Sequence, residues 1–412
     1  MKVVISHPTG NRNVREVLAA LIRSGKLSEF HTTLAADPEA GWLNFVPAAF
    51  RKEWLRRTYM VPADKLVSHP LLEIARMILP RIGFKGATRH ETGFASVDAV
   101  YRHFDRAVAD GLSRLAQKEQ LSAVYAYEDG ALETFKQAKK LGLTCIYDLP
   151  IAYWETGREL MMEEAERLPE WANTLGGGIK DSRVKLERKT HEMELADVVV
   201  GPGSFVLDSI PDWAKSKKLI MSPFGSPSAD IMQERDLKSE DRPMRVLFAG
   251  SMGQRKGLGD LFRAVKLIGG KDIELVVMGA PLAPAEFYRK QLPEFVFEPG
   301  RPNEQVLALM RSCDVFCLPS IVEGRALVMQ EAMSQGLPLI ITPNTGGADL
   351  IIEGETGFLV PIRSPESIAE KLTWLLANRS AIPEMGKLAQ KHAKKYTWDN
   401  YGNTIVQAIT GL

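Results

Sequence analysis

Short, uninterrupted apolar runs alternate with amphipathic stretches along much of the chain. Such runs occupy residues 2–6, 31–36, 122–127, 144–150, 315–320 and 337–342. An apolar run of this length without polar alternation is typical of a strand that is buried on both faces of a parallel sheet. The stretches between the runs repeat their apolar residues at helical spacing. The pattern therefore predicts an α/β protein.

The N-terminal end shows this alternation clearly. A run at 2–6 is followed by a turn that begins at His7, an amphipathic helix at 14–25 and a second run at 31–36. This order predicts two parallel strands joined by a right-handed crossover. The turn leads into a helix N-terminus, where free N–H groups and the helix dipole favour an anion. A plain tight turn, with a structural His7, is the alternative, because the glycine pattern of a dinucleotide site is absent.

The chain has 412 residues, which predicts two domains of roughly 200 residues each. A polar stretch rich in Ser, Asp and Pro, at 226–244, separates the two halves. We therefore place an N-terminal domain at 1–225 and a C-terminal domain at 226–395, with a last helix at about 396–412. Because both halves alternate strands with helices, the expected architecture is two Rossmann-like, doubly wound domains.

Composition narrows the classes of partner and compartment. Net charge is +1, so no overall field favours nucleic acid. The three cysteines, Cys145, Cys313 and Cys317, have no accompanying His/Cys cluster and are expected to be buried thiols. The start of the chain lacks the apolar run of a signal peptide, and no segment approaches the roughly 18 apolar residues of a membrane span. We therefore expect a cytoplasmic protein.

Residues 51–89 depart from this neutral balance. They contain nine Lys or Arg and three Asp or Glu, a local charge of +6, with aromatic and apolar residues interleaved. A stretch of this kind suits peripheral contact with the anionic inner face of a membrane. Two ordinary helices with a solvated basic face, or a site for an acidic glycan, are the alternatives.

Two glutamates lie near a predicted strand end in the second half. Glu323 follows the run at 315–320, and Glu331 comes eight residues later on the next helix. The run at 337–342 is then followed by the sequence NTGG, which is expected to open another helix. Ligands of open α/β sheets bind at the carboxyl ends of the strands, so Glu323 is a candidate site residue. One loop carboxylate and one solvated helix carboxylate are the alternative.

A glycine-containing loop, GSMGQRKG at 250–257, precedes a helix in the same half. It carries adjacent cations, Arg255 and Lys256, at the expected helix start. Such a loop suits a diphosphate, because the cations neutralise its charge and the glycines allow close approach. A solvated basic turn is the alternative.

Together these motifs resemble those of the family 4 glycosyltransferases. The signature of that family is Glu-x7-Glu, with Gly after the first Glu and Ala-Met after the second, and here it runs from Glu323 through Glu331 to Met333. The resemblance implies a GT-B architecture of two facing domains. It also implies transfer of a hexose, with retention, from a nucleotide diphosphate sugar to a glycan or lipid-linked acceptor. Neither a metal ion nor another cofactor is expected, and the implied role is cell-surface polysaccharide or glycolipid synthesis.

The resemblance assigns the charged residues separate tasks. Glu323 would lie beside the donor hexose and the reacting centre, as a catalytic residue. Glu331 would accept hydrogen bonds from the ribose hydroxyls, because a carboxylate accepts several such bonds. Lys256 would hold the diphosphate between them.

The other donor-binding residues that the resemblance implies lie in loops at predicted strand ends. They are Gly10, Asn11, Gly250, Gly300, Arg301, Gly324, Arg325, Ala326 and Leu327. The loop at 8–11 would face the donor across the cleft, and the turn at 299–301 would lie near the base. Residues 324–326 would offer backbone N–H groups to the sugar and phosphate.

Three positions depart from the family's pattern. Ser251 stands where an Arg is usual, so Arg255 is a hypothetical substitute phosphate ligand. Asp148 stands near the usual catalytic His and becomes the candidate catalytic group on that wall, with Glu128 next. The side chain of Arg325, where an apolar residue is usual, is expected to meet a donor or acceptor group. These departures leave an alternative function, that of a non-catalytic sugar-nucleotide-binding subunit of a polysaccharide assembly system.

Overall fold

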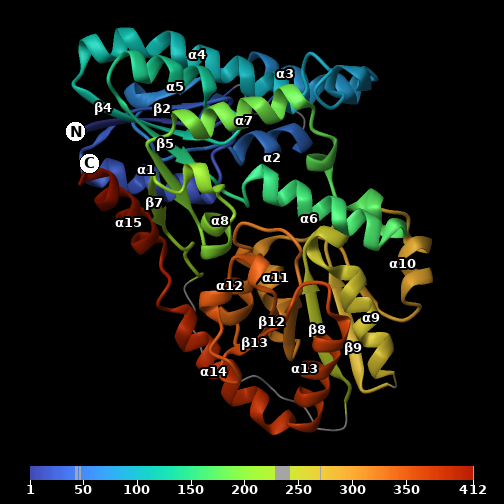
Figure 1. Cartoon of the computed structure of the whole chain (residues 1–412). Coiled ribbons are helices and arrows are strands. Elements are labelled where there is room, and N and C mark those ends of the chain that lie inside the picture. The colour runs from blue at the N-terminus through green and yellow to red at the C-terminus, as the bar shows by residue number, and fades with distance from the viewer. Residues whose placement is uncertain (42–44, 46–47, 228–241, 270, 412) are drawn as a thin grey trace.

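Two parallel sheets, each flanked by helices, form the upper and lower halves of the computed structural model (Figure 1). The structure describes residues 1–41, 45, 48–227, 242–269 and 271–411. Most of the expected polar linker, residues 228–241, therefore lies outside the described residues. The α/β class predicted from the apolar runs is confirmed.

The N-terminal sheet has the order β3-β2-β1-β4-β5-β6-β7 in the described residues, with every neighbouring pair parallel. Its strands are β1 (Lys2–Ser6), β2 (Leu27–Thr32), β3 (Leu66–Ser68), β4 (Leu121–Tyr127), β5 (Thr144–Asp148), β6 (Val198–Gly201) and β7 (Lys218–Met221). The ends of β1, β4 and β5 therefore share one edge, which confirms that the Gly10 turn, Glu128 and Asp148 lie along the same side of the sheet.

Helices cover both faces of this sheet. The helices of this half of the chain are α1 (Arg12–Arg23), α2 (Ala48–Leu55), α3 (Leu71–Ile78), α4 (Val97–Lys118), α5 (Leu132–Lys140), α6 (Trp154–Arg167), α7 (Arg183–Leu195) and α8 (Ser204–Asp208). One core lies between the sheet and α1, and a second lies between the opposite face and helices α4, α5 and α7. Cys145 is buried in the second core, as expected for an inert thiol.

The C-terminal sheet has the order β10-β9-β8-β11-β12-β13. Its strands are β8 (Met244–Ala249), β9 (Ile273–Met278), β10 (Val296–Glu298), β11 (Val315–Leu318), β12 (Leu339–Ile341) and β13 (Gly357–Leu359). The helices of this half are α9 (Leu258–Ile268), α10 (Ala285–Gln291), α11 (Asn303–Arg311), α12 (Leu327–Ser334), α13 (Pro365–Ala377), α14 (Ile382–Ala393) and α15 (Trp398–Thr410). Cys313 and Cys317 are free and buried in its core.

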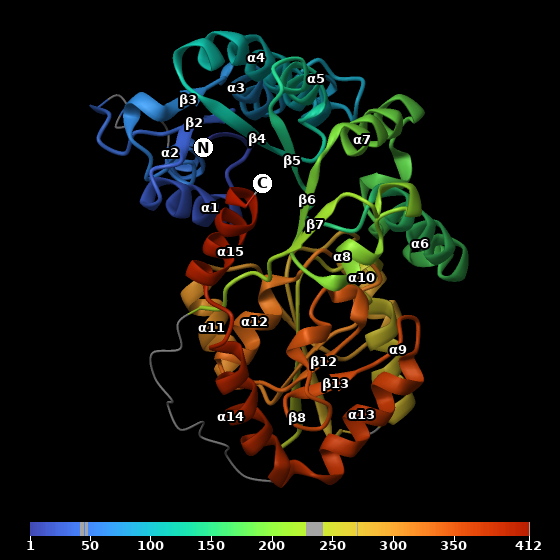
Figure 2. The same ribbon diagram turned by 60° about the vertical axis from the view of Figure 1, so that its left-hand side comes forward.

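Two segments cross from one half of the molecule to the other. Helix α15 rises beside α1 (Figure 2) and places Tyr401, Ile405 and Ile409 in the core beneath the N-terminal sheet. In the opposite direction, α6 and the 3-10 turn η5 (Pro169–Thr174) reach over the C-terminal sheet (Figure 1). Leu168 and Trp171 of this segment are buried in the C-terminal core. The two halves are thus joined by packed side chains as well as by the chain itself.

Two expectations about individual elements are wrong. The strand expected at 31–36 is Leu27–Thr32, because Leu27 and Phe30 are the residues that point into the core and pair with β1 and β3. The helix expected at NTGG is replaced by two short 3-10 turns, Pro343–Thr345 and Ala348–Leu350, whose tight hydrogen bonds close after three residues. Among the described residues, no helix has both the length and the apolar character required to cross a bilayer.

Candidate active site

Three charged side chains from two loops meet at the carboxyl edge of the C-terminal sheet. The Nζ atom of Lys256 lies 2.5 Å from Oε1 of Glu323, and a guanidinium nitrogen of Arg255 lies 2.6 Å from the same oxygen. Arg255 also donates to the carbonyl of Val322 at 3.0 Å. The two loops follow β8 and β11, which are neighbours in the sheet. The order of the strands therefore brings together the two motifs that the sequence holds about 70 residues apart.

Charge and burial make this cluster a suitable place for an anion. The side chains of Lys256 and Glu323 are only 12% and 11% exposed. Burial lowers the pKa of Lys256, Glu323 raises it, and the neighbouring Arg255 lowers it. Two cations face one carboxylate, so one positive charge has no balancing partner within the trio. A diphosphate entering the loop would supply the missing negative charge through charge-assisted hydrogen bonds.

The glutamate loop also touches the N-terminal half of the molecule. A side chain at Gly324 would place its Cβ 1.7 Å from the carbonyl oxygen of Pro150, two residues beyond β5. Any other residue would push the two loops apart at this point. At the start of α12, half-buried Leu327 packs against the N-terminal core. Glu323 is therefore held between the two halves, where a donor and an acceptor can meet.

Glu331 lies on α12, apart from the trio. Its Oε1 accepts a hydrogen bond of 2.8 Å from the side-chain amide of Asn303, at the start of α11. Burial raises the pKa of Glu331, whereas the Asn303 hydrogen bond and the charge of Arg12 lower it. Arg12 belongs to α1, whose N-terminus follows Asn11. The two glutamates thus contact different groups, and they are not placed to act on the same bond of a substrate.

Gly300 and Arg301 lie at the end of β10, the edge strand of the C-terminal sheet. Arg301 forms an ion pair with Glu298, three residues earlier. In the strand order, β9 lies between this turn and β8, the strand that precedes Arg255 and Lys256. A role near the nucleotide base therefore stays a prediction for Gly300 and Arg301.

The turn after β1 is organised by His7. Its Nδ1 accepts hydrogen bonds from the backbone N–H groups of Gly10 at 2.9 Å and Thr9 at 3.2 Å. Burial lowers the pKa of His7 to about 3, so the ring is neutral at physiological pH. These bonds support the structural alternative for His7. Asn11 comes next and is the exposed residue before α1.

Asp148 ends β5 and its side chain is buried rather than open to solvent. It is 3% exposed, and its Oδ2 atom has no hydrogen-bond partner in the described part of the chain. The pKa of Asp148 is raised to about 7. Burial is the main cause and Glu128 adds to it, whereas the nearby Tyr125 hydroxyl lowers the pKa. The charge of Asp148 also acts on Tyr401, which lies in α15. None of its contacts joins it to the trio of Glu323, so its catalytic role stays a prediction.

The raised pKa of Asp148 predicts a specific pH dependence of stability. Below about pH 4 the carboxyl is protonated in both the folded and the unfolded chain. Between about pH 4 and 7 only the unfolded chain releases this proton, so the free energy of unfolding falls as the pH rises. Asn cannot ionise, so Asp148→Asn should gain stability relative to the parent protein as pH rises. From pH 5 to 8 the relative gain should be about 2–3 kcal/mol, as measured by urea unfolding at both pH values. An unchanged difference between the two proteins would show that Asp148 ionises normally.

Glu128 lines a cavity of about 240 Å³ next to the trio. Its carboxylate accepts a hydrogen bond of 3.0 Å from Lys189 of α7, and burial raises its pKa while Lys189 lowers it. Other walls are formed by Trp154, Met161 and, from the C-terminal half, Arg255. The cavity therefore borders the same Arg255 that contacts Glu323.

The expectation for the side chain of Arg325 is wrong. Its guanidinium has no exposed surface and is bonded to Gln330, to the Gly346 carbonyl and to Asp349, at 2.7–3.0 Å. It also lies over the ring of Tyr396, 5.1 Å from the centroid. A side chain with these contacts braces the loop from behind and does not reach a substrate.

The backbone of the same loop is partly engaged. The N–H of Ala326 donates to the carbonyl of Thr345 at 3.3 Å, so the offer of this group to a ligand is not supported. For Gly324 and Arg325, donation of N–H groups to the sugar and phosphate stays a prediction. On the opposite loop, Gly250 lies 3.6–3.8 Å, measured from its ideal Cβ position, from the side-chain carbons of Lys256.

A metal-type cluster occurs elsewhere among the described residues. Ligand atoms of His90, Glu91 and Asp181 lie within 4.8 Å of one another. His90 already contacts both carboxylates, at 3.2 and 3.1 Å, and Lys185 lies 3.0 Å from Asp181. Both carboxylates therefore already have partners within the protein. The cluster shares no residue with the trio.

Sequence reasoning missed Asn303 and Gln254. Asn303 contacts Glu331, and Gln254 fixes the loop before Arg255 through hydrogen bonds to residues of η5 and α6. The position of Gln254 next to Arg255 in the sequence could have indicated a role in holding that loop. For Asn303 no local signal exists, because its partner lies on another helix.

The family described as Glycosyl transferases group 1 matches residues 231–395. This segment contains both glutamates and the Arg255–Lys256 loop, so the match covers the residues that form the site. The match covers less than half of this chain, and over that segment the chain is similar to the group 1 glycosyl transferases. This similarity agrees with the glycosyltransferase motifs that the sequence shows in the same segment.

Two curated relatives of this chain are D-inositol 3-phosphate glycosyltransferases of corynebacteria. That of Corynebacterium glutamicum (strain R) is 30% identical over 190 residues, 42% of this chain and 45% of the relative. That of Corynebacterium efficiens is 27% identical over 363 residues, 79% of this chain and 84% of the relative. This chain thus matches less than half of the length of the first relative.

Solved structures confirm the two-domain GT-B fold. Sucrose-phosphate synthase from Thermosynechococcus elongatus has a TM-score of 0.67 and 16% identity, covering 100% of this chain and 98% of its own. Anabaena HepE in complex with UDP has a TM-score of 0.61 and 15% identity, covering 100% of both chains. At these identities the likeness concerns the fold alone.

Proposed function

We propose that this protein is a glycosyltransferase that moves a hexose, with retention, from a nucleotide diphosphate sugar to a glycan or lipid-linked acceptor. The observation that carries the proposal is the trio of Lys256, Arg255 and Glu323 at the contact between the two halves, in which the lysine and the glutamate are largely buried. Its unbalanced positive charge suits the diphosphate, and its carboxylate suits the hydroxyls of the transferred sugar. The implied setting is cell-surface polysaccharide or glycolipid synthesis.

The donor would extend from the trio along the carboxyl edge of the C-terminal sheet. Lys256 and Arg255 would take the diphosphate, and Glu323 the hexose. Glu331 would accept from the ribose, sharing its carboxylate with Asn303, and the turn of Gly300 and Arg301 would border the base. UDP is the first nucleotide to test, because HepE, a protein of the same fold, was solved with UDP.

Retention would place the acceptor on the side from which the diphosphate leaves. The acceptor oxygen would bond to the anomeric carbon as the bond from that carbon to the phosphate oxygen breaks. The acceptor proton would pass to the departing phosphate oxygen, and Lys256 would stabilise the charge that develops there. The cavity of about 240 Å³ suits this geometry, because Arg255 forms part of its wall. Protein cations would take over the charge that a metal ion would otherwise neutralise.

The acceptor would enter through this cavity beside Glu128 and Lys189. Its volume is below that of a typical drug-sized pocket and suits a single hydroxylated ring. The corynebacterial relatives carry D-inositol 3-phosphate in their names, so a phosphorylated cyclitol belongs among the acceptors to be tested. Asp148 would supply a polar group on the N-terminal wall.

Peripheral membrane contact through residues 51–89 is a further part of the proposal. Ile82 and Phe84 are 60% and 65% exposed, and Lys85 and Arg89 beside them are exposed as well. Of the other cations of the stretch, Arg57 and Arg76 are committed to ion pairs with buried Glu73, at 2.6 and 2.7 Å. The exposed apolar and basic residues at 81–89 therefore form the part that suits an anionic lipid surface.

Vesicle sedimentation tests this contact. The protein should sediment with vesicles rich in phosphatidylserine, and the Ile82→Asp/Phe84→Asp variant should lose most of that binding at low salt, because two exposed apolar residues that would enter the lipid surface become anions. Leu267→Asp is the control, since Leu267 is an equally exposed apolar residue on α9. Equal sedimentation of both variants and the parent would remove the membrane from the proposal.

A thermal-shift panel with UDP-, GDP-, ADP- and dTDP-sugars tests the donor class. A donor present at 100 times its dissociation constant should stabilise the folded protein by about 2.7 kcal/mol. One nucleotide should stand out, because the base site reads one base. Stabilisation by none of them would contradict the proposed function.

A further inference from the structure

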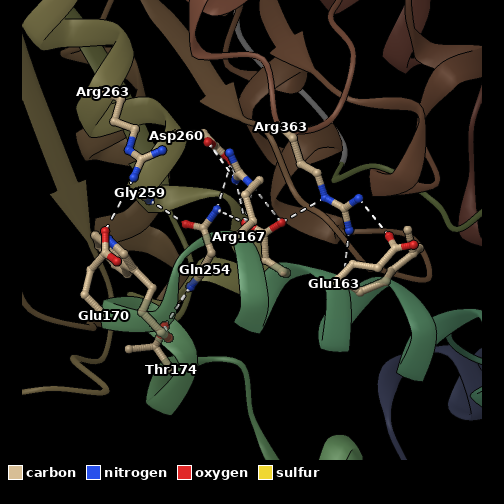
Figure 3. Close-up of polar contacts among 12 residues, drawn as sticks. Glu163, Arg167, Glu170, Thr174, Gln254, Gly259, Asp260, Arg263 and Arg363 are labelled. Carbon is tan, nitrogen blue, oxygen red and sulfur yellow. Dashed lines mark hydrogen bonds and ion pairs between the residues drawn. The ribbon is translucent and has the colours of Figure 1, made fainter.

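A segment from the first half of the chain forms part of the C-terminal half. After β5, helix α6 and turn η5 cover the start of α9, as Figure 3 shows. Trp171 lies 4.8 Å from the ring of Phe287 and 5.9 Å from that of Phe262, between ring centroids. We call residues 154–174 the strap. Because the strap contributes to the C-terminal core, it stays with the donor half of the site.

A buried polar network joins the strap to α9. Glu164 of the strap and Asp260 of α9 both accept hydrogen bonds from Arg167, at 2.5–3.2 Å. Arg363, from the loop after β13, donates to Glu164 at 2.9 Å. Glu164 and Asp260 are buried, and the two guanidinium groups balance their two charges. Such a network is rigid only while every member is satisfied.

Gln254 occupies the centre of this network (Figure 3). Its side-chain NH2 donates to Glu164 at 2.7 Å and to Asp260 at 2.8 Å, and its side-chain oxygen accepts from the N–H of Gly259 at 2.8 Å. Its own backbone N–H donates to the hydroxyl of Thr174 at 2.9 Å. Gln254 is fully buried, and all of these groups are satisfied. Only a neutral amide offers two donors and one acceptor here without adding a charge.

Gln254 directly precedes the two cations of the trio. Residues 254–256 form a single 3-10 turn. The far end of the turn is fixed by Gly257, at φ 74°, where a Cβ would lie 1.9 Å from the carbonyl oxygen of Pro319. Arg255 and Lys256 are therefore held between an anchor on the strap and an anchor on the loop after β11.

We propose that Gln254 is a positioning residue, which uses the strap to hold Arg255 and Lys256 at the spacing that a nucleoside diphosphate requires. This inference rests on the proposed function, since it takes these cations as the diphosphate ligands. A misplacement of about 1 Å at a binding group can cost about 100-fold in rate. The strap also lines the neighbouring cavity through Trp154 and Met161. Changes in the strap should thus alter donor binding without touching the donor.

The test measures dissociation constants for UDP, GDP, ADP and dTDP by calorimetry, and KM and kcat for the matching nucleotide sugar. Gln254→Leu should weaken the preferred nucleotide at least tenfold and raise KM in proportion, with a smaller effect on kcat. Thr174→Val removes one hydrogen bond from the strap side and should weaken binding in the same direction. If Gln254→Leu fails to fold, the affinity of Thr174→Val decides whether the hydrogen bonds to the strap position the two cations.

Arg263→Ala provides the matched control. Arg263 and Glu170 join the same two segments at 3.4 Å, but both are more than one-third exposed and neither touches the 254–256 turn. The Arg263→Ala variant should bind the preferred nucleotide with the same affinity as the parent protein. If Gln254→Leu and Thr174→Val also bind like the parent, while Lys256→Ala has lost binding, the positioning role is overturned. If Lys256→Ala binds normally, or no nucleotide binds the parent, it is the proposed function that fails.

Discussion

Lys256→Ala should remove the stabilisation that a nucleotide sugar gives. Truncating one partner of a buried charge pair costs about 2–5 kcal/mol. A loss of about 2.8 kcal/mol, within this range, raises the dissociation constant of the donor about 100-fold. A donor that stabilises the parent by about 2.7 kcal/mol would then stabilise the variant by only about 0.4 kcal/mol at the same concentration. The physical reason is that Lys256 is buried and contributes to the unbalanced positive charge of the trio. Thermal shift with the preferred donor measures the effect.

The control for this variant is Lys266→Ala. Lys266 is an exposed cation on α9, the helix that follows the same loop. The Lys266→Ala substitution removes one positive charge from the C-terminal half without altering the trio. The donor should therefore stabilise this variant as much as it stabilises the parent protein. A full shift in Lys256→Ala would show that the diphosphate is held elsewhere.

Glu323→Gln should separate binding from turnover. Gln keeps the size of the side chain but removes the negative charge that Lys256 and Arg255 now share, at 2.5 and 2.6 Å. The two cations then become fully available, so a nucleoside diphosphate should bind at least as tightly as before. Turnover should fall about 10²–10³-fold, because a preorganised charged group at the reacting centre is lost. Steady-state rates and calorimetry on one preparation measure both effects.

Glu331→Gln is the matched comparison for Glu323→Gln. Glu331 contacts Asn303 and not the cations, so its replacement should weaken donor binding with little further loss of kcat. The same profile in both variants would contradict the separate tasks assigned to the two glutamates. It would also remove the reason to place the reacting centre at Glu323.

Much of the architecture could be predicted because strands and their order follow local rules. Unbroken apolar runs such as 315–320 identified buried parallel strands, and loops at the ends of such strands gather at one edge. That is why Lys256 and Glu323 could be expected in one site although they are far apart in the sequence. The second strand was misplaced because Thr33, Leu34 and Ala35 continue the apolar pattern after the chain has left the sheet.

The contacts between distant segments could not be predicted. The strap has six glutamates between 153 and 171, and nothing local distinguishes buried Glu164 from its exposed neighbours. Its partners Gln254 and Arg363 lie far along the chain, and a carboxylate is buried only where such partners meet. Arg325 was misjudged for the same reason, because Asp349 and Tyr396 bind its guanidinium from behind the loop.

Release of nucleotide from the stabilising nucleotide sugar tests the central claim most directly. The parent protein should release the nucleoside diphosphate slowly with water as acceptor, and faster with a suitable hydroxylated acceptor. Glu323→Gln should bind the same donor and release about 10²–10³-fold less. Binding without any release by the parent, or equal release by Glu323→Gln, would contradict the account. The first of these results would favour a non-catalytic sugar-nucleotide-binding subunit instead.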